Sequence, residues 1–293
     1  MRFAHKFGFT LVLLFCVPLI LAQSNVKVAH LTVTRIDVPG SSDTNLSGIN
    51  NNGVIVGSFD FIRGPDWHSF TWSNDAFNYF DVPNALFTIA RGINDTDQIV
   101  GYYGLNNSES PGFIYDGQAF ITVQYPGATS TTPDAINNVG LVVGYWFPVV
   151  EGFRFNGSQF RLIVVPGSLL TMPRGVNNLQ DVVGTAEVPG NTYEGFLYSG
   201  GKFKILNFPG ATSTVPSGIN DSRIVVGAYI PNNAPQACFF WKNSKFMTFK
   251  VPGANMSSCS GISNAGVIVG SYEDSYYFWH GFTTSPITDA DFQ

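Results

Sequence analysis

A short pattern of hydrophobic and polar positions recurs six times along the chain. Its first copy reads Gly-Ile-Asn-Asn-Asn-Gly-Val-Ile-Val-Gly over residues 48–57. In the polar centre, an Asn can bond to its own backbone and a Gly accepts a positive φ, which is typical of a tight turn between two strands. The final glycines of the six copies, at 57, 101, 144, 184, 227 and 270, are 44, 43, 40, 43 and 43 residues apart.

Two further sequence signatures recur with the same period as this turn. The first is a short aromatic strand, at 68–72, 112–115, 152–155, 195–198, 238–241 and 280–282. The second is a longer strand that ends in proline, at Pro39, Pro83, Pro126, Pro166, Pro209 and Pro252. Proline cannot donate to a strand ladder and is tolerated at strand ends. Each unit of about 43 residues is therefore predicted to hold four strands.

Four strands in a unit of this length match one blade of a β-propeller. A solenoid β-helix is the main alternative, but its rungs are shorter and lack recurring hairpins. The repeats begin with a fourth strand at 31–39 and end with a third strand at 277–284. A ring explains this order, because the N-terminal strand can complete the last blade. We therefore predict an all-β fold, a single six-bladed β-propeller over residues 31–284, closed by its N-terminal strand.

Residues 1–22 have the features of a secretory signal peptide. A basic start with Arg2 and Lys6 precedes an apolar run at 11–21 and the small residue Ala22. The run is short for a membrane span of about 20 residues, which disfavours the alternative of an uncleaved anchor. The sequence thus predicts a secreted or cell-surface protein, extracellular or periplasmic, with no integral membrane span after cleavage. Residues 23–30 are predicted to form a short N-terminal segment, and residues 285–293 a C-terminal tail.

Cleavage of the signal peptide would leave two of the three cysteines, Cys238 and Cys259. An oxidising compartment permits them to pair, provided that their Cα atoms lie about 4.4 to 6.8 Å apart. The repeats place these cysteines on different strands of neighbouring units. A disulfide and two free thiols are both compatible with the sequence.

The order of the three signatures resembles that of the bacterial extracellular HAF repeats, named for a His-Ala-Phe motif. Closest to that motif are His68-Ser69-Phe70 and His280-Gly281-Phe282, and the other four units keep only the phenylalanine. The resemblance covers about residues 31–284. It implies a bacterial secreted or cell-surface protein with a propeller-like fold. It implies no established activity, so it supplies no catalytic residue.

Composition narrows the classes of partner. Charged residues make up 12% of the chain and aromatic residues 15%, with 31 Gly and 17 Pro. Soluble domains usually carry about 25% charged residues, and a protein built of packed strands rather than amphipathic helices explains the deficit. The net charge of −5 disfavours nucleic acid and anionic membranes as partners, because both require clustered Lys and Arg.

Loops of variable length are expected on one face of the ring, between the second and third strands of each unit and between units. Function commonly lies on loops that a rigid scaffold carries. The aromatic residues of these loops form the predicted ligand-binding set: Trp67, Tyr103, Trp146, Tyr193, Tyr229, Tyr276 and Tyr277. Aromatic faces suit sugar rings or peptide segments. The alternative is that these side chains pack between blades.

Several sharper interpretations are disfavoured by the repeat positions. His68 and His280 occupy one position in adjacent units, too far apart to share a zinc ion at about 2.0 to 2.1 Å from each nitrogen, so structural histidines are favoured. The same separation argues against Glu151 and Glu194 as a carboxylate pair for glycoside hydrolysis. The recurring asparagines are accounted for by their turns: Asn50, Asn94, Asn137, Asn177 and Asn220. We predict no catalytic residue, metal or cofactor.

The function predicted from the sequence is that of a secreted, monomeric, non-catalytic propeller that binds a polysaccharide or a cell-surface protein through its variable loops. Two alternatives stay open. One is a carbohydrate-active hydrolase or lyase that uses acids near the channel mouth, such as Asp66, Glu187 or Glu273. The other is a purely structural component of the envelope or matrix.

Overall fold

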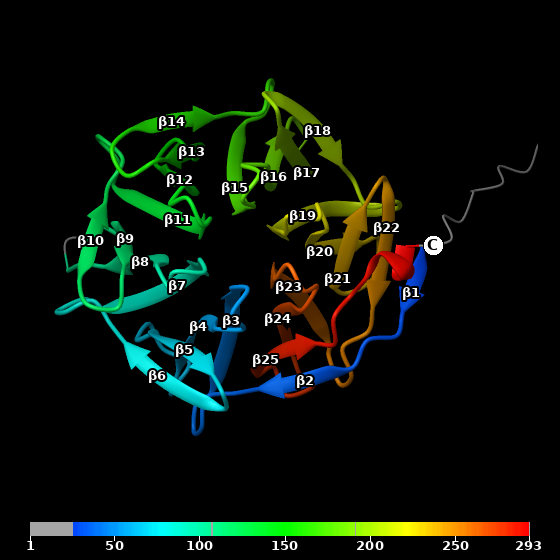
Figure 1. The fold of residues 1–293 in the computed structure, drawn as a ribbon, viewed down its shortest axis with the longest axis horizontal. Coiled ribbons are helices and arrows are strands. Elements are labelled where there is room, and N and C mark those ends of the chain that lie inside the picture. The colour runs from blue at the N-terminus through cyan, green and yellow to red at the C-terminus, as the bar shows by residue number, and fades with distance from the viewer. Residues whose placement is uncertain (1–25, 107, 191, 293) are drawn as a thin grey trace, which may run out of the picture.

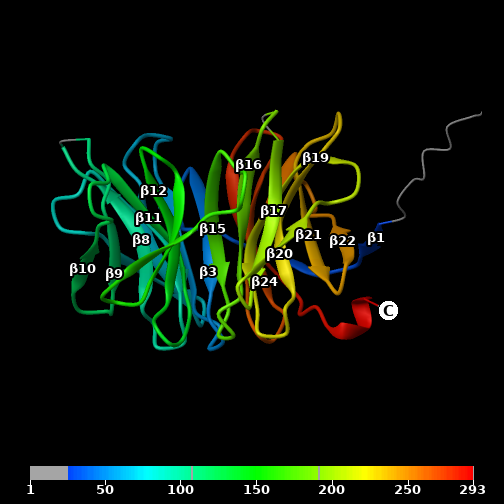
Figure 2. The same ribbon diagram turned by 90° about the horizontal axis from the view of Figure 1, so that it is seen from above.

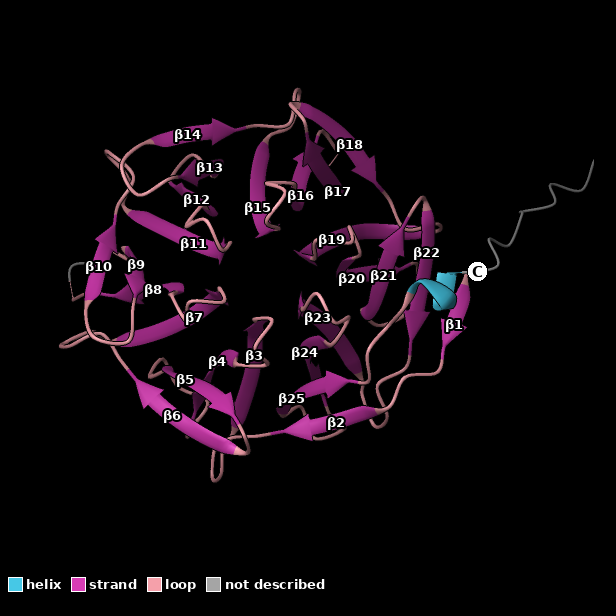
Figure 3. Ribbon diagram, viewed as in Figure 1, coloured by secondary structure: helices cyan, strands magenta, loops and turns pink. Residues whose placement is uncertain are grey.

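The computed structural model describes residues 26–292, except for residues 107 and 191. Its regular structure consists of strands and one short 3₁₀ helix, η1 (Asp289–Phe292). The strands are arranged in a ring, and the first strand of each unit lies nearest the centre (Figure 1 and Figure 3). Viewed from the side, the strands of neighbouring units run side by side across the thickness of the ring (Figure 2). The fold is an all-β propeller.

Four of the sheets contain four strands each. Three of these sheets are consecutive in sequence: β3 (Asp43–Ile49), β4 (Ile55–Asp60), β5 (His68–Ser73) and β6 (Ala76–Phe80); β7 (Phe87–Ile93), β8 (Ile99–Gly104), β9 (Gly112–Tyr115) and β10 (Phe120–Val123); β11 (Ser130–Ile136), β12 (Val142–Phe147), β13 (Glu151–Phe155) and β14 (Phe160–Ile163). The fourth combines the two ends of the repeat region: β23 (Met256–Ile262), β24 (Ile268–Glu273), β25 (Trp279–Thr284) and β2 (Val33–Ile36). All pairings within these sheets are antiparallel.

The fifth sheet is larger and mixed, with nine strands. Its members are β15 (Leu170–Val176), β16 (Val182–Val188), β17 (Thr192–Ser199), β18 (Lys202–Leu206), β19 (Ala211–Ile219), β20 (Val225–Pro231), β21 (Ala237–Lys242), β22 (Lys245–Phe249) and β1 (Lys27–Ala29). β1 pairs with β22 in parallel, and β17 pairs with β19 in parallel through Tyr193 and Ser213.

The predicted count of six blades is wrong, because the described strands form four four-stranded sheets and this nine-stranded sheet. The cause is the length of two strands. β17 and β19 span 8 and 9 residues, and their extended ends meet in a parallel bridge that merges two sets of strands. The corresponding approach of Ser110 to Ser130 is only an isolated bridge. Repeat spacing gives the order of strands, but it does not tell how far each strand extends.

The N-terminal strand pairs with the last strand of the chain, as the sequence predicts. β2 runs antiparallel to β25, with Val33 opposite Thr284 and Ile36 opposite Gly281. This pairing covers the edge that β25 would otherwise expose. The two ends of the repeat region therefore close the ring.

Every unit has a glycine and a phenylalanine opposite each other at the centre of its sheet. The glycines are the final residues of the turn signature, and the phenylalanines belong to the aromatic strand: Gly57 and Phe70, Gly101 and Phe113, Gly144 and Phe153, Gly184 and Phe196, Gly227 and Phe239, Gly270 and Phe282. Each of the six phenylalanines is 0% exposed. A Cβ atom on any of these glycines would lie 2.0 to 2.2 Å from a carbonyl oxygen of the innermost strand. Glycine is required because the two backbones approach so closely.

The recurring asparagines connect one turn to the next. Within a turn, Asn50 Oδ1 accepts hydrogen bonds from the backbone nitrogens of Asn52 and Val54 at 3.0 and 2.9 Å. Its Nδ2 donates to the carbonyl oxygen of Asn94 in the next unit at 3.1 Å. The same bond between units continues from Asn94, Asn137, Asn177 and Asn220, at 3.0 to 3.2 Å. These asparagines are each 3% exposed, so their amides serve the scaffold.

The residues that follow them form a closed circle, which we call the turn ring: Asn51, Asp95, Asn138, Asn178, Asp221 and Asn264. The backbone nitrogen of each residue donates to the side-chain oxygen of the next, at 2.7 to 2.9 Å, and Asn264 returns to Asn51. The side-chain amides add four bonds. The carboxylate of Asp95 accepts from the amides of Asn51 and Asn138, and the carboxylate of Asp221 accepts from those of Asn178 and Asn264. The turn ring joins all the repeats at one end of the channel.

The terminal segments pack against the ring. Residues 27–29 of the predicted N-terminal segment form β1 on the edge of the nine-stranded sheet. The tail folds back as well, since Ser285 donates to the Thr32 carbonyl at 2.8 Å and Ile287 and Phe292 are 2% and 8% exposed. The predicted signal peptide lies outside the described residues.

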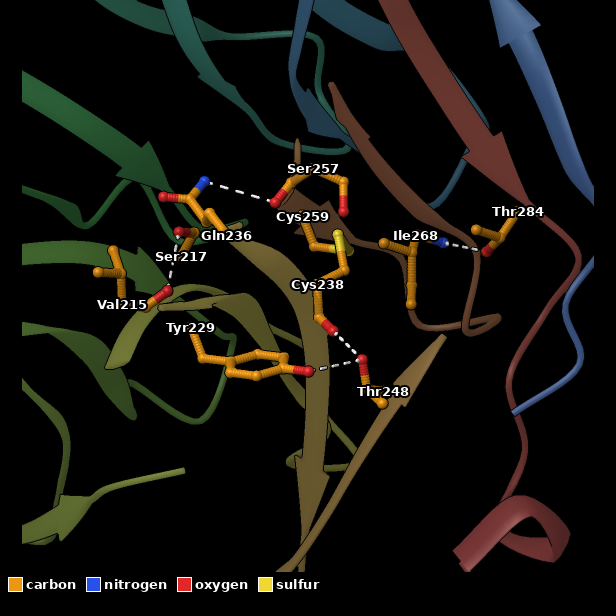
Figure 4. Close-up of a disulfide and its surroundings, with 10 residues drawn as sticks. All are labelled: Val215, Ser217, Tyr229, Gln236, Cys238, Thr248, Ser257, Cys259, Ile268 and Thr284. Carbon is orange, nitrogen blue, oxygen red and sulfur yellow. Dashed lines mark hydrogen bonds between the residues drawn. A yellow bond between two sulfur atoms is a disulfide. The ribbon is translucent and has the colours of Figure 1, made fainter. Parts of the chain in front are cut away.

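A disulfide joins Cys238 of β21 to Cys259 of β23, with Cα atoms 5.4 Å apart (Figure 4). Both cysteines are 0% exposed within an apolar cluster that includes Phe240 and Phe282. The bond links the nine-stranded sheet to the sheet in which β2 pairs with β25. It therefore secures the part of the ring where the closure occurs.

Replacement of a sheet-centre glycine should destabilise the protein strongly. In Gly144→Ala, the new Cβ would lie 2.0 Å from the Thr132 carbonyl oxygen, and a shift of backbone costs about 1–3 kcal/mol or more. The midpoint of denaturant unfolding should fall, whereas Leu179→Ala, on a side chain that is 55% exposed, should leave it nearly unchanged. Equal midpoints for the two variants would contradict the close approach.

The turn ring should give stability that depends on pH. Burial opposes ionisation of Asp95, but the hydrogen bonds from Asn51 and Asn138 outweigh it and hold the pKa of Asp95 below its usual value. The ionised carboxylate therefore stabilises the fold above its unfolded pKa of about 3.9, and this contribution is lost as pH falls through the lower folded pKa. Asp95→Asn should lower the free energy of unfolding at pH 7 by about 1 kcal/mol, because the amides of Asn51 and Asn138 both donate to Asp95 Oδ2 and would lose this acceptor.

Denaturant unfolding at pH 7 and pH 3 checks this expectation. The difference between the wild type and Asp95→Asn should shrink at pH 3. Asp66→Asn serves as the control, since Asp66 is exposed. A difference that is the same at both pH values would show that ionised Asp95 has no part in stabilising the turn ring.

Candidate functional site

The channel opens at one end into a cavity of about 370 Å³. Its wall comes from the innermost strands β3, β7, β11, β15, β19 and β23, and Trp67 and Trp279 lie at its mouth. Towards the turn ring, the channel narrows to spaces of about 80 and 70 Å³. The end with the two tryptophans is hereafter the wide end.

A β-bulge in each innermost strand sets which side chain enters the channel. The pairing of β3 with β4 joins Leu46 to Gly57 and Gly48 to Val56, and it skips Ser47. The other five innermost strands skip the equivalent residue. A bulge leaves the extra residue unpaired and redirects its side chain, and bulges are frequent beside functional sites. The six skipped residues, which we call the bulge ring, are Ser47, Arg91, Asp134, Arg174, Ser217 and Ser260.

The bulge ring concentrates charge on one side of the channel. Asp134 lies between two arginines, with its Oδ1 3.2 Å from Arg91 Nε and its Oδ2 3.8 Å from an Arg174 terminal nitrogen. The Asp134 side chain is 5% exposed, and those of Arg91 and Arg174 are 32% and 25% exposed. The carboxylate is thus enclosed, whereas both guanidinium groups are accessible from the channel.

Two tyrosines hold the guanidinium groups in place. Arg91 lies over the ring of Tyr102 at 5.7 Å, and Arg174 lies over the ring of Tyr145 at 6.0 Å. These distances suit a cation–π attraction. The two arginines are therefore packed on one side and open to the cavity on the other.

Burial and charge oppose each other in this group. Burial raises the pKa of Asp134, and the two guanidinium groups act in the opposite direction. Burial disfavours the charged form of Arg91, but Asp134, Tyr102 and Tyr145 together outweigh it and raise the pKa of Arg91. Arg91 therefore keeps its charge, because arginine is not deprotonated in proteins.

The two tryptophans at the mouth are fixed through their backbones. Trp279 donates its backbone N–H to Asp43 Oδ1 at 2.7 Å, and the Trp67 carbonyl accepts from the Thr88 backbone N–H at 2.8 Å. Both indole side chains are partly exposed. They come from the same repeat position in two adjacent units and flank the same side of the cavity.

An apolar rim adjoins the mouth, formed by two loops that Arg63 joins. Arg63 donates to the carbonyl oxygen of Tyr277 and lies 4.1 Å from the centre of the Phe278 ring. The exposed side chains of this rim are Phe61 at 52%, Ile62 at 73%, Tyr276 at 75%, Tyr277 at 66% and Phe278 at 38%. This rim surface can contact a ligand that extends out of the cavity.

The aromatic residues predicted from the loops do not form one platform. Three of them pack against other residues. Tyr103 bonds to Thr122 of its own sheet at 3.3 Å. Trp146 stacks on Tyr125 at 4.5 Å and Tyr229 stacks on Phe208 at 3.6 Å, on residues that connect one unit to the next. The alternative interpretation, packing, applies to these three. Trp67 lies at the cavity mouth, Tyr276 and Tyr277 belong to the rim, and Tyr193 is 37% exposed elsewhere on the loop face.

The histidines at the repeat position beside Trp67 and Trp279 have structural partners. His68 Nδ1 lies 2.7 Å from Asp81, and His280 lies 2.9 Å from Asp37 and 3.2 Å from Asp274. Within the described part of the chain, no three His, Cys, Asp or Glu side chains gather in a group suited to hold a metal ion.

The acids considered for catalysis do not line the cavity. Glu194 accepts a hydrogen bond from Asn207 at 3.0 Å. Asp66, Glu151, Glu187 and Glu273 are also absent from the cavity wall, in which Asp134 is the one carboxylate among the described residues. The structure therefore brings none of these acids together at the wide end.

Sequence reasoning missed Arg91, Asp134, Arg174 and Trp279. A signal was present, because the residue before each Gly-Ile or its equivalent is Ser, Arg, Asp, Arg, Ser and Ser in the six units. A repeat position that varies in charge while its neighbours stay constant is a candidate for function. This position faces the channel only because of the bulge, and the repeat pattern alone does not reveal the bulge.

No family model and no curated protein matches the chain. Solved structures do match. A catalytically inactive variant of virginiamycin B lyase from Staphylococcus aureus is 9% identical over 87% of this chain and 100% of its own, with a TM-score of 0.52. The β-propeller domain of the Trilobed protease from Pyrococcus furiosus, described as having an open velcro topology, is 11% identical over 84% and 98%, with a TM-score of 0.54. TolB from Acinetobacter baumannii is 12% identical over 80% and 64%, with a TM-score of 0.54.

These likenesses show the propeller fold alone. At such low identity they carry no residue and no activity over to this chain.

Loss of the enclosed carboxylate should destabilise the propeller. Asp134→Ala leaves two guanidinium groups together without their counter-charge, which should lower the free energy of unfolding by about 3 kcal/mol. The matched control is the triple variant Arg91→Ser, Asp134→Ser and Arg174→Ser, because serine occupies the other three positions of the bulge ring. Denaturant unfolding should place the triple variant within about 1 kcal/mol of the wild type. A triple variant less stable than Asp134→Ala would contradict the proposed balance of charges.

Proposed function

We propose that the protein is a non-catalytic binding propeller that takes a saccharide unit into the cavity at the wide end. The observation that carries this proposal is the pair of tryptophans, Trp67 and Trp279, at the mouth of a cavity with a polar wall. Aromatic faces pack against the apolar faces of sugar rings, and polar side chains fix the orientation of the ring.

The size and chemistry of the wall support a saccharide. A volume of about 370 Å³ lies within the range of small-ligand sites. Serine hydroxyls line much of the wall, from Ser47, Ser58, Ser217, Ser258, Ser260 and Ser271. Each hydroxyl can both donate and accept, which matches the hydroxyl groups of a sugar.

The rim supports a ligand longer than one unit. Tyr276 and Tyr277 are among the most exposed large side chains of the described protein, beside Phe61 and Ile62. Exposed apolar surface of this kind commonly marks an interaction site. We propose that the rim contacts the remainder of a polysaccharide chain. The test below also shows whether a cell-surface protein binds the rim instead of a polysaccharide.

The arrangement of acids favours binding over hydrolysis. Glycoside hydrolysis generally uses two carboxyl groups about 5 to 9.5 Å apart across the bond that breaks. The described cavity wall carries the one carboxylate of Asp134, which is enclosed by two arginines. The hydrolase alternative therefore has no pair of acids at this site.

We also propose that the protein is exported, as the resemblance to HAF repeats and the features of residues 1–22 imply. The Cys238–Cys259 disulfide supports this, because such bonds persist mainly in oxidising compartments. Among the described residues, no helix has the length and apolar character needed to cross a bilayer.

A glycan array probed with residues 23–293 tests the proposed function. Binding to a defined group of polysaccharides is expected, and Trp67→Ala and Trp279→Ala should each weaken it about tenfold, or by about 1.4 kcal/mol. Tyr79→Ala is the control, because this side chain is 56% exposed on the outer strand β6 and lies outside the cavity wall.

Three results would count against the proposal. Absence of binding to any glycan would reject the saccharide, and capture of a surface protein would then identify the other partner class. Formation of new reducing ends or unsaturated sugars would reject the non-catalytic role. Equal losses in the tryptophan variants and in Tyr79→Ala would place the site elsewhere.

A further inference from the structure

The cavity wall has two chemically different halves. Consecutive units contribute Arg91, Asp134 and Arg174 on one side, and the remaining members of the bulge ring, Ser217, Ser260 and Ser47, contribute hydroxyls on the other. Six repeats that are alike in their turns and glycines thus differ at the one position that enters the channel. The scaffold needs no charge there, because three units use serine.

The charged half has an excess of positive charge. Two guanidinium groups face one carboxylate, in a protein whose formal net charge is −5. The Asp134 side chain is only 5% exposed, so its negative charge is enclosed, whereas Arg91 and Arg174 are 32% and 25% exposed. A ligand in the cavity therefore meets cations first.

The hydrogen-bonding capacity of this group is only partly used. Each guanidinium has five N–H donors. The Nε atoms of both arginines and Asp134 Oδ2 are buried and have no hydrogen-bond partner among the described residues. Arg174 donates to the Met172 sulfur at 3.8 Å, which is a weak bond. The recorded partners use only part of the five donors of each guanidinium, and both arginine side chains are partly exposed at the cavity wall.

Guanidinium groups match the planar geometry of a carboxylate and form strong charge-assisted pairs with carboxylate or sulfate. The stacking of Arg91 on Tyr102 and of Arg174 on Tyr145 restricts their movement, so little ordering is needed on binding. The opposite wall of the same cavity offers serine hydroxyls. The ligand that fits both halves carries an anionic group on one side and hydroxyl groups on the other.

We infer that the cavity selects acidic saccharides, whose carboxylate or sulfate group binds Arg91 and Arg174. This inference rests on the proposed function, which it makes more specific. Asp134 acts as a positioning residue that keeps the two guanidinium groups together. The tryptophans contact the sugar ring, and the arginines distinguish a charged sugar from a neutral one.

Calorimetric titration with a matched pair of ligands tests the selection. The ligands are an oligogalacturonide and its fully methyl-esterified form, which differ in charge but hardly in shape. The wild type should bind the acid at least tenfold more tightly than the ester at a fixed salt concentration. The triple variant Arg91→Ser, Asp134→Ser and Arg174→Ser should bind both equally, at about the affinity of the wild type for the ester. A sulfated galactose oligosaccharide then shows whether the site prefers carboxylate or accepts either anion.

The outcomes separate the inference from the proposed function. Equal binding of acid and ester by the wild type would overturn the inference and leave the saccharide site in place. A preference for the acid that persists in the triple variant would also overturn it, because the arginines would then have only a structural role.

If no oligosaccharide binds, the proposed function fails. The melting temperature with and without citrate then tests whether Arg91 and Arg174 bind an anion at all. A rise in melting temperature with citrate that is present in the wild type and lost in the triple variant would support an anion site. The absence of that difference would overturn the inference as well.

Discussion

Each innermost strand has one residue more than its partner strand can pair, and this bulge determines both the scaffold and the site. Directly before each bulge, the backbone of the innermost strand lies so close to the sheet-centre glycine that a Cβ atom would not fit there. One side of this contact buries a phenylalanine at 0% exposure. On the other side, the skipped residue turns into the channel, where Arg91, Asp134 and Arg174 lie.

The units are joined at both ends of the channel, by side chains at the narrow end and by backbone groups at the wide end. At the narrow end, the turn ring closes on itself and joins the last repeat to the first through Asn264 and Asn51. Near the chain ends, β2 pairs with β25 and the Cys238–Cys259 disulfide ties neighbouring sheets together. The wide end is also tied from unit to unit, by backbone hydrogen bonds such as those of Thr88 to Trp67 and of Thr171 to Val150. These bonds use main-chain atoms, so the side chains of the bulge ring can differ from unit to unit.

The sequence was sufficient for the repeated parts of the fold. The period, the tight turns and the strand that closes the ring follow from turn chemistry and from the order of the signatures. The number of separate sheets does not follow from these features. Two sets of strands merge into one sheet through the extended ends of β17 and β19, and no local preference encodes the length of those strands. The loop aromatics were interpreted as one group, but Trp146 and Tyr229 stack on Tyr125 and Phe208, and such partners become neighbours only in the folded chain.

The candidate site was hidden for a related reason. Arg91, Asp134 and Arg174 are about 40 residues apart in sequence, and only the bulge brings them to one wall. The most direct test of the proposed site is a crystal structure of residues 23–293 with an acidic disaccharide. We expect a sugar ring between Trp67 and Trp279, with its carboxylate bound by Arg91 and Arg174. A disaccharide held on the rim or on another surface, with the cavity free of it, would contradict the proposed site.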